Sequence, residues 1–228
     1  MGDDLTRPAF YALRSGGWRD YVTLLHPPYT LWNLSYAAIG AAIAPRVHWN
    51  VLGWTVLAFL LAMGVGAHAL DELHGRPLRT RIPDRVLVLL AAASIAAACM
   101  IGIHVATFTT WWLLAFVAFG AFVVVAYNVE LAGGLLHTSF WFAFAWGAFP
   151  ALTAYFASAQ RLRLDAIAIA VFAFATSLAQ RRLSTEVRAA RRQAGDAALA
   201  RPAESALQLL SAAMPLLAGA LLLARWRY

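Results

Sequence analysis

Seven apolar stretches run through this chain, and they constrain its fold more than any other feature. Each is close to the roughly 17 to 25 residues that a helix needs to cross the hydrocarbon core of a bilayer. The stretches lie at 22–44, 51–72, 86–107, 110–127, 135–157, 164–181 and 205–224. Because a bilayer offers no water to backbone N–H and C=O groups, apolar segments of this length are stable there as helices. The sequence predicts an all-α integral membrane bundle with about seven transmembrane helices.

The composition supports this class and argues against others. Hydrophobic residues make up 62% of the 228 positions, and charged residues make up 13%. That apolar fraction exceeds what the core of an ordinary soluble domain can bury. The net charge of +7 comes from arginines between the apolar stretches, where contact with lipid headgroups explains them better than nucleic acid does. We expect one membrane domain over residues 1–228, with membrane lipids and no nucleic acid as partners.

The distribution of the arginines predicts the orientation of the bundle. With the amino terminus in the cytoplasm, thirteen arginines fall on the cytoplasmic side and five on the outer side. Cytoplasmic loops generally carry the excess of positive charge. We therefore expect a multi-pass protein of the cell (inner) membrane, with the amino terminus inside and the carboxyl terminus outside. Residues 1–21 form a cytoplasmic or interfacial segment, in which 5–20 are expected to make a short interfacial helix.

A cluster of ionisable side chains at the end of the second stretch is the strongest functional signal. His68, Asp71 and Glu72 stand at i, i+3 and i+4, so a helix that continues through them brings them to one face. Ionisable groups near membrane depth usually face a cavity and serve a function. Two carboxylates and an imidazole suit a divalent cation, a phosphate ester held through that cation, or a proton relay. The alternative is a helix end at which Glu72 pairs with Arg76.

The loop that follows this cluster is rich in arginine. Two prolines and a glycine prevent a regular helix over residues 75–84. Arg76, Arg79 and Arg81 could hold an anionic phosphate, and control of membrane topology explains the same arginines equally well. Asp84 is expected to cap the amino-terminal end of the third helix.

Two further polar segments are expected on the same face of the membrane. We single out Tyr127, Asn128 and Glu130 after the fourth stretch, and Arg181, Ser184 and Arg188 after the sixth. The first group could contact a metal or a substrate, or could end a helix before a glycine turn. The second group lies along one stripe of a polar helix that continues to about residue 195. It could grip a diphosphate, or form a solvated basic face on anionic lipid.

Two features inside the apolar stretches could belong to a binding cavity. Asn33 is a polar residue in the first stretch, where an interhelical hydrogen bond is the commoner role and a place facing the cavity is the functional one. Aromatic residues are unusually dense in the fifth stretch: Trp141, Phe142, Phe144, Trp146 and Phe149. Such a group could line an apolar pocket and stabilise a carbocation through the faces of its rings.

These motifs resemble those of the UbiA superfamily of intramembrane prenyltransferases. Residues 25–31 resemble the opening helix of that family, and residues 67–71 with Arg76-Pro77 fall where it carries its first aspartate-rich motif and an Arg-Pro pair. Residues 127–150 resemble the passage between its fourth and fifth helices, and 180–195 fall where its second acidic motif would be. The resemblance covers roughly residues 20 to 200. It implies a UbiA-like bundle that binds a prenyl diphosphate with Mg²⁺ and ionises it to an allylic cation.

The chain also departs from the family pattern. Ala67, His68 and Gly75 stand where the first motif has asparagine, aspartate and aspartate, and the second motif region has no aspartate before Asp196. The bundle would have seven spans in place of the family's usual nine.

Two hypotheses about function follow from the sequence. In the first, the protein is a UbiA-type enzyme that acts on an isoprenoid diphosphate by prenyl transfer or terpene cyclisation. Asp71 and Glu72 would then hold Mg²⁺, His68 would be a ligand or an acid–base group, and arginines would stabilise the departing diphosphate. In the second, the missing aspartates mark a non-catalytic isoprenoid or lipid binder, or an assembly partner of another membrane enzyme.

Overall fold

The computed structural model describes residues 8–193 and 197–226, and within these ranges the chain forms helices joined by short loops, with no β-strand. The prediction of an all-α chain is confirmed. The helices are α1 (Trp18–Leu24), α2 (Pro27–Ile43), α3 (Trp49–Phe59), η1 (Leu60–Ala67), α4 (His68–Leu73), α5 (Asp84–Phe108), α6 (Leu113–Asn128), α7 (Leu131–Gly134), α8 (Ser139–Ala143), η2 (Phe144–Ala148), α9 (Phe149–Ala159), α10 (Leu164–Gln193) and α11 (Ala197–Trp226).

Among the residues that the structure describes, five continuous helices are long and apolar enough to cross a membrane. Two of them are composite rods, in which α3, η1 and α4 run together over Trp49–Leu73, and α8, η2 and α9 run together over Ser139–Ala159. These five correspond to the second, third, fifth, sixth and seventh apolar stretches. The first and fourth stretches form the shorter helices α2, of 17 residues, and α6, of 16 residues.

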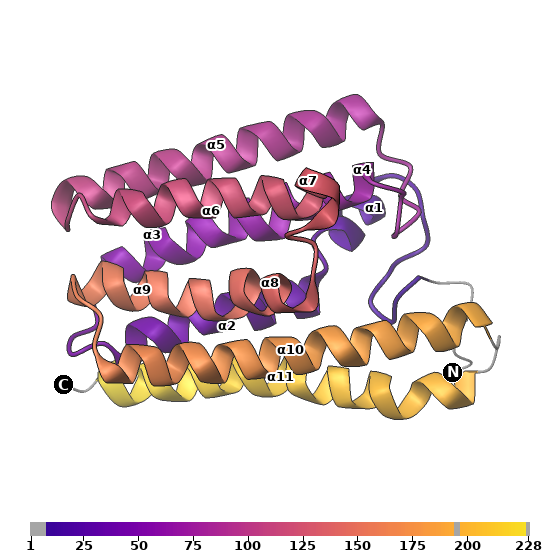
Figure 1. Ribbon diagram of the computed structural model, residues 1–228. Coiled ribbons are helices and arrows are strands. Elements are labelled where there is room, and N and C mark those ends of the chain that lie inside the picture. The colour runs from indigo at the N-terminus through magenta and orange to yellow at the C-terminus, as the bar shows by residue number, and fades with distance from the viewer. Residues whose placement is uncertain (1–7, 194–196, 227–228) are drawn as a thin grey trace.

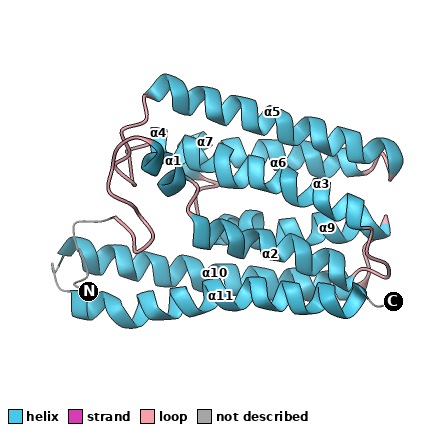
Figure 2. Cartoon of the chain, turned by 180° about the vertical axis from the view of Figure 1, so that it is seen from behind, coloured by secondary structure: helices cyan, strands magenta, loops and turns pink. Residues whose placement is uncertain are grey.

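The helices lie roughly side by side in two groups (Figures 1 and 2). In one group α2 packs against α9 and α11, and α10 packs against α11. In the other, α5 packs against the rod of α3 and η1 and against α6. The long helices α10 and α11 extend beyond the other helices at one end of the bundle (Figure 1).

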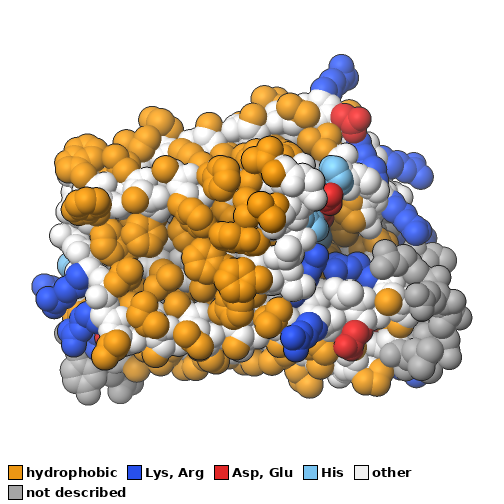
Figure 3. Space-filling view, viewed as in Figure 1, with side chains coloured by type: hydrophobic (Ala, Val, Ile, Leu, Met, Phe, Trp, Pro, Cys, Tyr) orange, Lys and Arg blue, Asp and Glu red, His pale blue; other side chains and the backbone are white. Residues whose placement is uncertain are grey.

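Glycines allow the closest approaches between helices. A Cβ atom at Gly40 of α2 would collide with the backbone of Ala151 in α9, and one at Gly147 would lie 2.5 Å from the carbonyl oxygen of Ala173 in α10. Small residues permit such contacts between helices in a membrane, where packing rather than water exclusion drives association. The face of the bundle that Figure 3 shows is largely apolar. Large apolar side chains are exposed on the outer helices, such as Leu89 of α5 at 67% and Leu216 of α11 at 72%. The protein is therefore a helical bundle with the surface of a membrane protein.

Both composite rods contain a π-helical segment, η1 and η2. A π-helical turn holds one more residue than an α-helical turn, and such turns are common near functional sites. The segment η1 ends at Ala67, directly before His68. It therefore sets the direction in which every side chain of α4 points.

Two local predictions were wrong. Residues 8–17 form turns and bends, and the first helix begins only at Trp18, because Gly16 and Gly17 adopt positive φ angles and interrupt the chain. The amino-terminal part of the predicted helix 5–20 lies outside the described residues. Asp84 is the first residue of α5, with Pro83 at the cap position, and its carboxylate pairs with Arg76 instead of capping the helix.

Candidate functional site

The three polar segments picked out from the sequence meet at one end of the bundle. His74 Nε2, after α4, lies 3.8 Å from Glu130 Oε1, after α6. The Arg181 guanidinium of α10 lies 5.2 Å from the centre of the Phe142 ring in α8. Basic, acidic and histidine side chains gather in a hollow at this end (Figure 3). We call it the polar hollow, and it comprises His26, His68, Asp71, Tyr127, His137, Arg181 and Arg188.

Two histidines stack on one another in the polar hollow. The ring centres of His26 and His68 are 4.0 Å apart and their planes differ by 16°. His68 Nδ1 donates to the Gly64 carbonyl at 3.1 Å, so the neutral His68 ring keeps its lone pair on Nε2. His26 Nδ1 shares a hydrogen bond of 2.8 Å with the Tyr11 hydroxyl, while its buried Nε2 has no partner. The pair presents imidazole nitrogens that are ready to accept or exchange a proton.

Burial shifts the pKa values of His26, at the amino-terminal end of α2, and of Tyr11, which is hydrogen-bonded to it. The pKa of His26 lies well below its ordinary value of 6.5, because burial penalises the charged ring and because His68 and Arg188 add repulsion. Burial also raises the pKa of Tyr11 well above its ordinary value. Both groups are therefore neutral at physiological pH, with Tyr11 as a hydroxyl and His26 as a neutral ring.

Asp71 is the carboxylate of the hollow. Its carboxylate interacts electrostatically with Arg188 and Arg181 of α10 and with His137, which lies in the link before α8. Its own side chain is partly exposed. A second carboxylate, Glu130, is exposed at the rim beside His74 and His137. Within the hollow one carboxylate is set against two arginines, and this excess of positive charge suits an anionic ligand.

Tyr127 and His137 form the wall of the hollow beside α6. Their rings stack with centres 4.4 Å apart, and His137 Nδ1 donates to the Tyr127 carbonyl at 3.0 Å. The exposed Glu130 carboxylate lies 3.9 Å from His137 Nδ1. The Tyr127 hydroxyl is buried without a partner. Asn128, in contrast, bonds its Nδ2 to the Val124 carbonyl of its own helix at 2.7 Å, so it supports α6.

Two buried amide oxygens, one on α2 and one on α10, have no hydrogen-bond partner. The hydroxyls of Tyr36 and Thr176 share a hydrogen bond of 2.8 Å that fixes how these helices face one another. Asn33 and Gln180 each stand about one helical turn from that contact, on the side of the polar hollow. Both are buried, and the Asn33 Oδ1 and Gln180 Oε1 atoms have no hydrogen-bond partner. Buried polar atoms without partners are rare and point to a bound water, ion or ligand.

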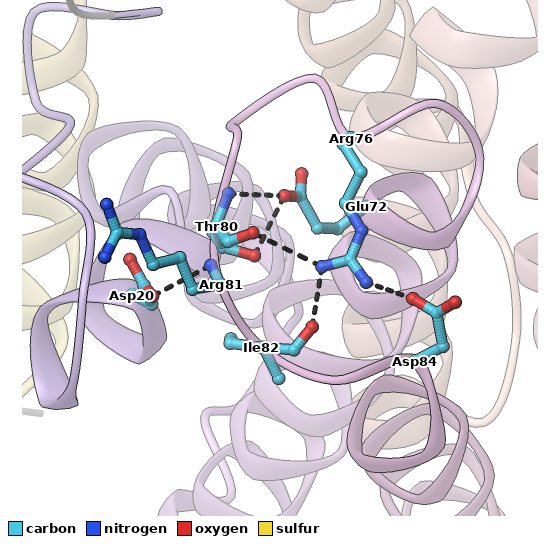
Figure 4. A network of polar contacts seen from close by, with 7 residues as sticks. All are labelled: Asp20, Glu72, Arg76, Thr80, Arg81, Ile82 and Asp84. Carbon is cyan, nitrogen blue, oxygen red and sulfur yellow. Dashed lines mark hydrogen bonds and ion pairs between the residues drawn. The ribbon is translucent and has the colours of Figure 1, made fainter.

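Glu72 points to the loop that follows α4 and holds it in place (Figure 4). Its side chain is 0% exposed. Oε1 accepts hydrogen bonds from the Thr80 amide at 2.8 Å and the Thr80 hydroxyl at 2.9 Å, and Oε2 accepts one from the Leu78 amide at 2.9 Å. Both oxygens are therefore occupied, and Glu72 acts here as an anchor of the loop.

Arg76 belongs to the same anchored loop. Its guanidinium pairs with Asp84 and donates to the Ile82 carbonyl at 2.6 Å (Figure 4). The alternative in which its side chain pairs with Glu72 is therefore wrong. Arg79 is exposed and has a positive φ of 56°. On α10, Ser184 is buried and donates its hydroxyl to the Arg181 carbonyl at 3.0 Å. The structure thus brings Asp71, Tyr127, Arg181 and Arg188 together. Arg76 is held in the loop, and the Ser184 hydroxyl is used within its own helix.

The described residues contain no group of three His, Cys, Asp or Glu side chains placed to hold one metal ion. Asp71 has no second free carboxylate beside it, because Glu72 is occupied. Mg²⁺ commonly binds through one or two carboxylates together with the phosphates of a substrate. The residues therefore fit Mg²⁺ that arrives on a diphosphate, with Asp71 and His68 as the groups that could contact it, better than a metal held by the protein alone.

Apolar pockets lie deeper in the bundle. One, of about 80 Å³, lies between α3, α5, α6 and α9, and a second, of about 30 Å³, shares Phe59, Gly120 and Phe149 with it. Trp146 lines the second pocket, and its ring centre lies 4.6 Å from that of Tyr127. As expected from the fifth apolar stretch, its aromatic residues Trp146 and Phe149 line an apolar pocket. The Trp146 ring therefore lies between that pocket and Tyr127 of the polar hollow.

No protein-family model, curated protein or solved structure matches this chain. The resemblance to the UbiA superfamily stays a prediction that rests on the sequence motifs.

Sequence reasoning gave His26 no role of its own. One signal could have found it: His26 precedes Pro27-Pro28, and a helix that begins at a proline pair places the preceding residue at its amino-terminal end. Because the first and second stretches run antiparallel, that end lies beside the end of the second stretch, where His68 is.

The low pKa of His26 predicts a dependence of stability on pH. The folded protein keeps His26 neutral, whereas the unfolded chain binds a proton below about pH 6.5. The free energy of unfolding should therefore be maintained above that pH and fall as the pH decreases below it, by up to about 1.4 kcal/mol per pH unit for this group. Unfolding in mild detergent between pH 7.5 and 5 measures this slope. The His26→Phe variant should have a smaller slope, and an equal slope in both proteins would contradict the prediction.

Proposed function

We propose that this protein is an intramembrane enzyme that acts on an isoprenoid diphosphate, by transfer of the prenyl group or by cyclisation. The observation that carries the proposal is the pairing of a positively charged hollow with an apolar pocket across one residue, Trp146. A diphosphate is a compact multivalent anion and an isoprenoid chain is a long apolar group, so a substrate of this class matches the two parts in polarity. The adjoining pockets of about 30 and 80 Å³ would have to widen to admit the whole chain. The proposal keeps the resemblance to the UbiA superfamily and takes all seven apolar stretches as transmembrane helices. The polar hollow then lies on the cytoplasmic side of the cell membrane.

In this proposal Arg181 and Arg188 bind the diphosphate. The allylic C–O bond breaks so that both electrons leave with the diphosphate oxygen, and the two guanidinium groups stabilise the negative charge that develops there. Positioned cations are most effective where charge builds up in the transition state, because they need no reorganisation at that moment. Mg²⁺, when bound with the substrate, would supply further positive charge at the leaving group.

The aromatic side chains and the histidines act on the other product of that cleavage. The faces of Trp146, Phe142 and Tyr127 stabilise an allylic cation until a nucleophile or an alkene of the same chain captures it. The proton released on capture is accepted by a neutral imidazole, for which His68 Nε2 carries the available lone pair. The buried amide oxygens of Asn33 and Gln180 lie where an acceptor could be oriented.

Release of diphosphate tests the proposal directly. The purified protein in nanodiscs is supplied with prenyl diphosphates of several lengths, with Mg²⁺ or with a chelator, and free diphosphate is measured. Mg²⁺-dependent release is expected for at least one length. Saturable binding of the same compounds without release in any condition would favour the alternative, a non-catalytic isoprenoid binder or assembly partner.

Neighbouring arginines on α10 provide a matched pair for the same assay. Arg181→Ala should lower kcat/KM by about 30-fold, since hydrogen bonds to charged groups contribute about 1.5–3 kcal/mol. Arg182 is exposed and has no contact with the polar hollow among those the structure describes, so Arg182→Ala should leave kcat/KM within about two-fold of wild type. Equal losses in the two variants would show that general charge on α10 matters and not the position of Arg181.

A further inference from the structure

A second polar pocket lies at the end of the bundle opposite the polar hollow. Its volume is about 270 Å³, and it is formed where α3 begins, where α5 ends and where α9 ends. Its polar lining consists of His48, Asn50, Thr109, Ser158 and Gln160. We call it the far-end pocket. In liquid water each molecule occupies about 30 Å³, so the pocket has room for a small polar group with several waters.

The far-end pocket opens on the amino-terminal turn of α3. His48, at the cap position, makes no side-chain hydrogen bond to the helix. The amide groups of Trp49, Asn50 and Val51 belong to the first turn, where backbone N–H groups have no acceptor within the helix. Both Trp49 and Asn50 line the pocket. Since α3 opens a continuous rod of 25 residues, the positive end of its dipole is directed into the pocket.

Ser158 supplies an independent sign of a ligand. Its side chain is 7% exposed, it lines the far-end pocket, and its hydroxyl has no partner. Nearby helical hydroxyls are satisfied differently, since Thr55, Thr109 and Thr153 each donate to the carbonyl four residues earlier at 2.7–2.8 Å. A buried hydroxyl that does not make this bond keeps an unused donor at the wall of the pocket.

The charges around the far-end pocket favour an anion. None of the described residues that line it is acidic. The acid at this end, Asp165, already accepts hydrogen bonds from the Tyr155 hydroxyl at 2.7 Å and from the Ala166 amide at 3.0 Å. Arg161 follows the lining residue Gln160 directly in the chain and is exposed. Backbone amides, a hydroxyl and a nearby guanidinium are the donors that phosphate groups meet at the ends of helices.

We infer that the far-end pocket binds a phosphate group, either the headgroup of a membrane phospholipid or free inorganic phosphate. The phosphate oxygens would accept hydrogen bonds from the first-turn amides of α3 and from the Ser158 hydroxyl. This site is separate from the polar hollow and does not depend on the function proposed for it.

Binding is measured in an Arg181→Ala, Arg188→Ala background, so that the polar hollow does not contribute. In one arm, inorganic phosphate is titrated into delipidated protein in detergent and thermal unfolding is followed, with chloride at the same ionic strength as the control. In the other, protein extracted from phosphatidylglycerol vesicles or from neutral glycolipid vesicles is weighed by native mass spectrometry. Saturable stabilisation by phosphate identifies the free anion, and retention of one phosphatidylglycerol but no glycolipid identifies the headgroup.

Variants of the lining residues decide whether either signal comes from this pocket. Ser158→Ala should weaken binding about ten-fold, the effect of losing one hydrogen bond to a charged group. Ser177→Ala removes the other buried serine hydroxyl that has no partner and should leave binding unchanged.

The backbone amide can be tested at the second helical position of α3. Asn50→Pro removes its N–H at a position that α2 already fills with Pro28, and it should weaken binding more than Asn50→Ala does. Absence of both signals, or signals that Ser158→Ala and Asn50→Pro leave unchanged, would overturn the inference.

Discussion

Replacing Glu72 by alanine is expected to destabilise the protein by about 3–5 kcal/mol, the effect of removing one member of a buried charged network. The substitution leaves the Leu78 amide, the Thr80 amide and the Thr80 hydroxyl without their acceptor. The site is closed to bulk solvent, because Leu78 and Thr80 are 7% exposed and Glu72 is 0% exposed. The loop between α4 and α5 would lose the contacts that fix its path.

Unfolding by denaturant in mild detergent measures the loss of stability, and hydrogen exchange at the Leu78 and Thr80 amides locates it. Glu130→Ala is the matched control, because Glu130 is an exposed carboxylate and its removal should change stability by less than about 0.5 kcal/mol. Glu72→Gln should lose an amount of stability between those of Glu72→Ala and Glu130→Ala. The glutamine side chain keeps one oxygen that can accept a hydrogen bond, but its NH2 group would face the second backbone N–H, which is also a donor. Protection of the loop amides that is unchanged in Glu72→Ala would refute the anchoring role.

The neighbouring acid is expected to behave in the opposite way. Asp71→Asn should reduce Mg²⁺-dependent diphosphate release by at least about 100-fold, the usual effect of removing one electrostatic group from a catalytic site. Its stability should stay close to wild type, because the Asp71 side chain is partly exposed and the substitution keeps its size. A kinetic loss without a loss of stability separates a role in the reaction from a role in the fold.

Diphosphate release and unfolding by denaturant can both be measured on Asp71→Asn and on Glu72→Gln, which change adjacent residues. Activity should fall in Asp71→Asn, and stability should fall in Glu72→Gln. Retained turnover in Asp71→Asn would exclude Asp71 from the reaction, and with it the proposed contact to Mg²⁺. A large loss of stability in Asp71→Asn would show instead that Asp71 is structural.

The sequence predicted which parts of the chain meet, because the order of apolar stretches determines which loops share an end of the bundle. It therefore located Asp71, Tyr127, Arg181 and Arg188 correctly as neighbours. It could not predict that Glu72 turns away from Asp71. Successive residues of a helix point about 100° apart, and which of them faces the hollow depends on the π-helical segment η1 upstream.

The far-end pocket shows a second limit of the sequence. A serine in an apolar helix usually donates to a carbonyl of its own helix, and nothing in the residues around Ser158 distinguishes it from Thr153, which does so. Its free hydroxyl depends on how α3, α5 and α9 end beside one another. The same holds for Asn33 and Gln180, whose unpartnered oxygens arise from the packing of α2 on α10.

The rod formed by α3, η1 and α4 connects the two ends of the molecule. Its 25 residues, Trp49–Leu73, span about 37 Å at the α-helical rise of 1.5 Å per residue. Its middle segment, η1, holds an extra residue in its turn. If that turn tightened to an α-helix, the part beyond it would rotate by about 100°, and His68 and Asp71 would exchange places with their neighbours. A change of helical register in η1 would therefore change which side chains of α4 face the polar hollow.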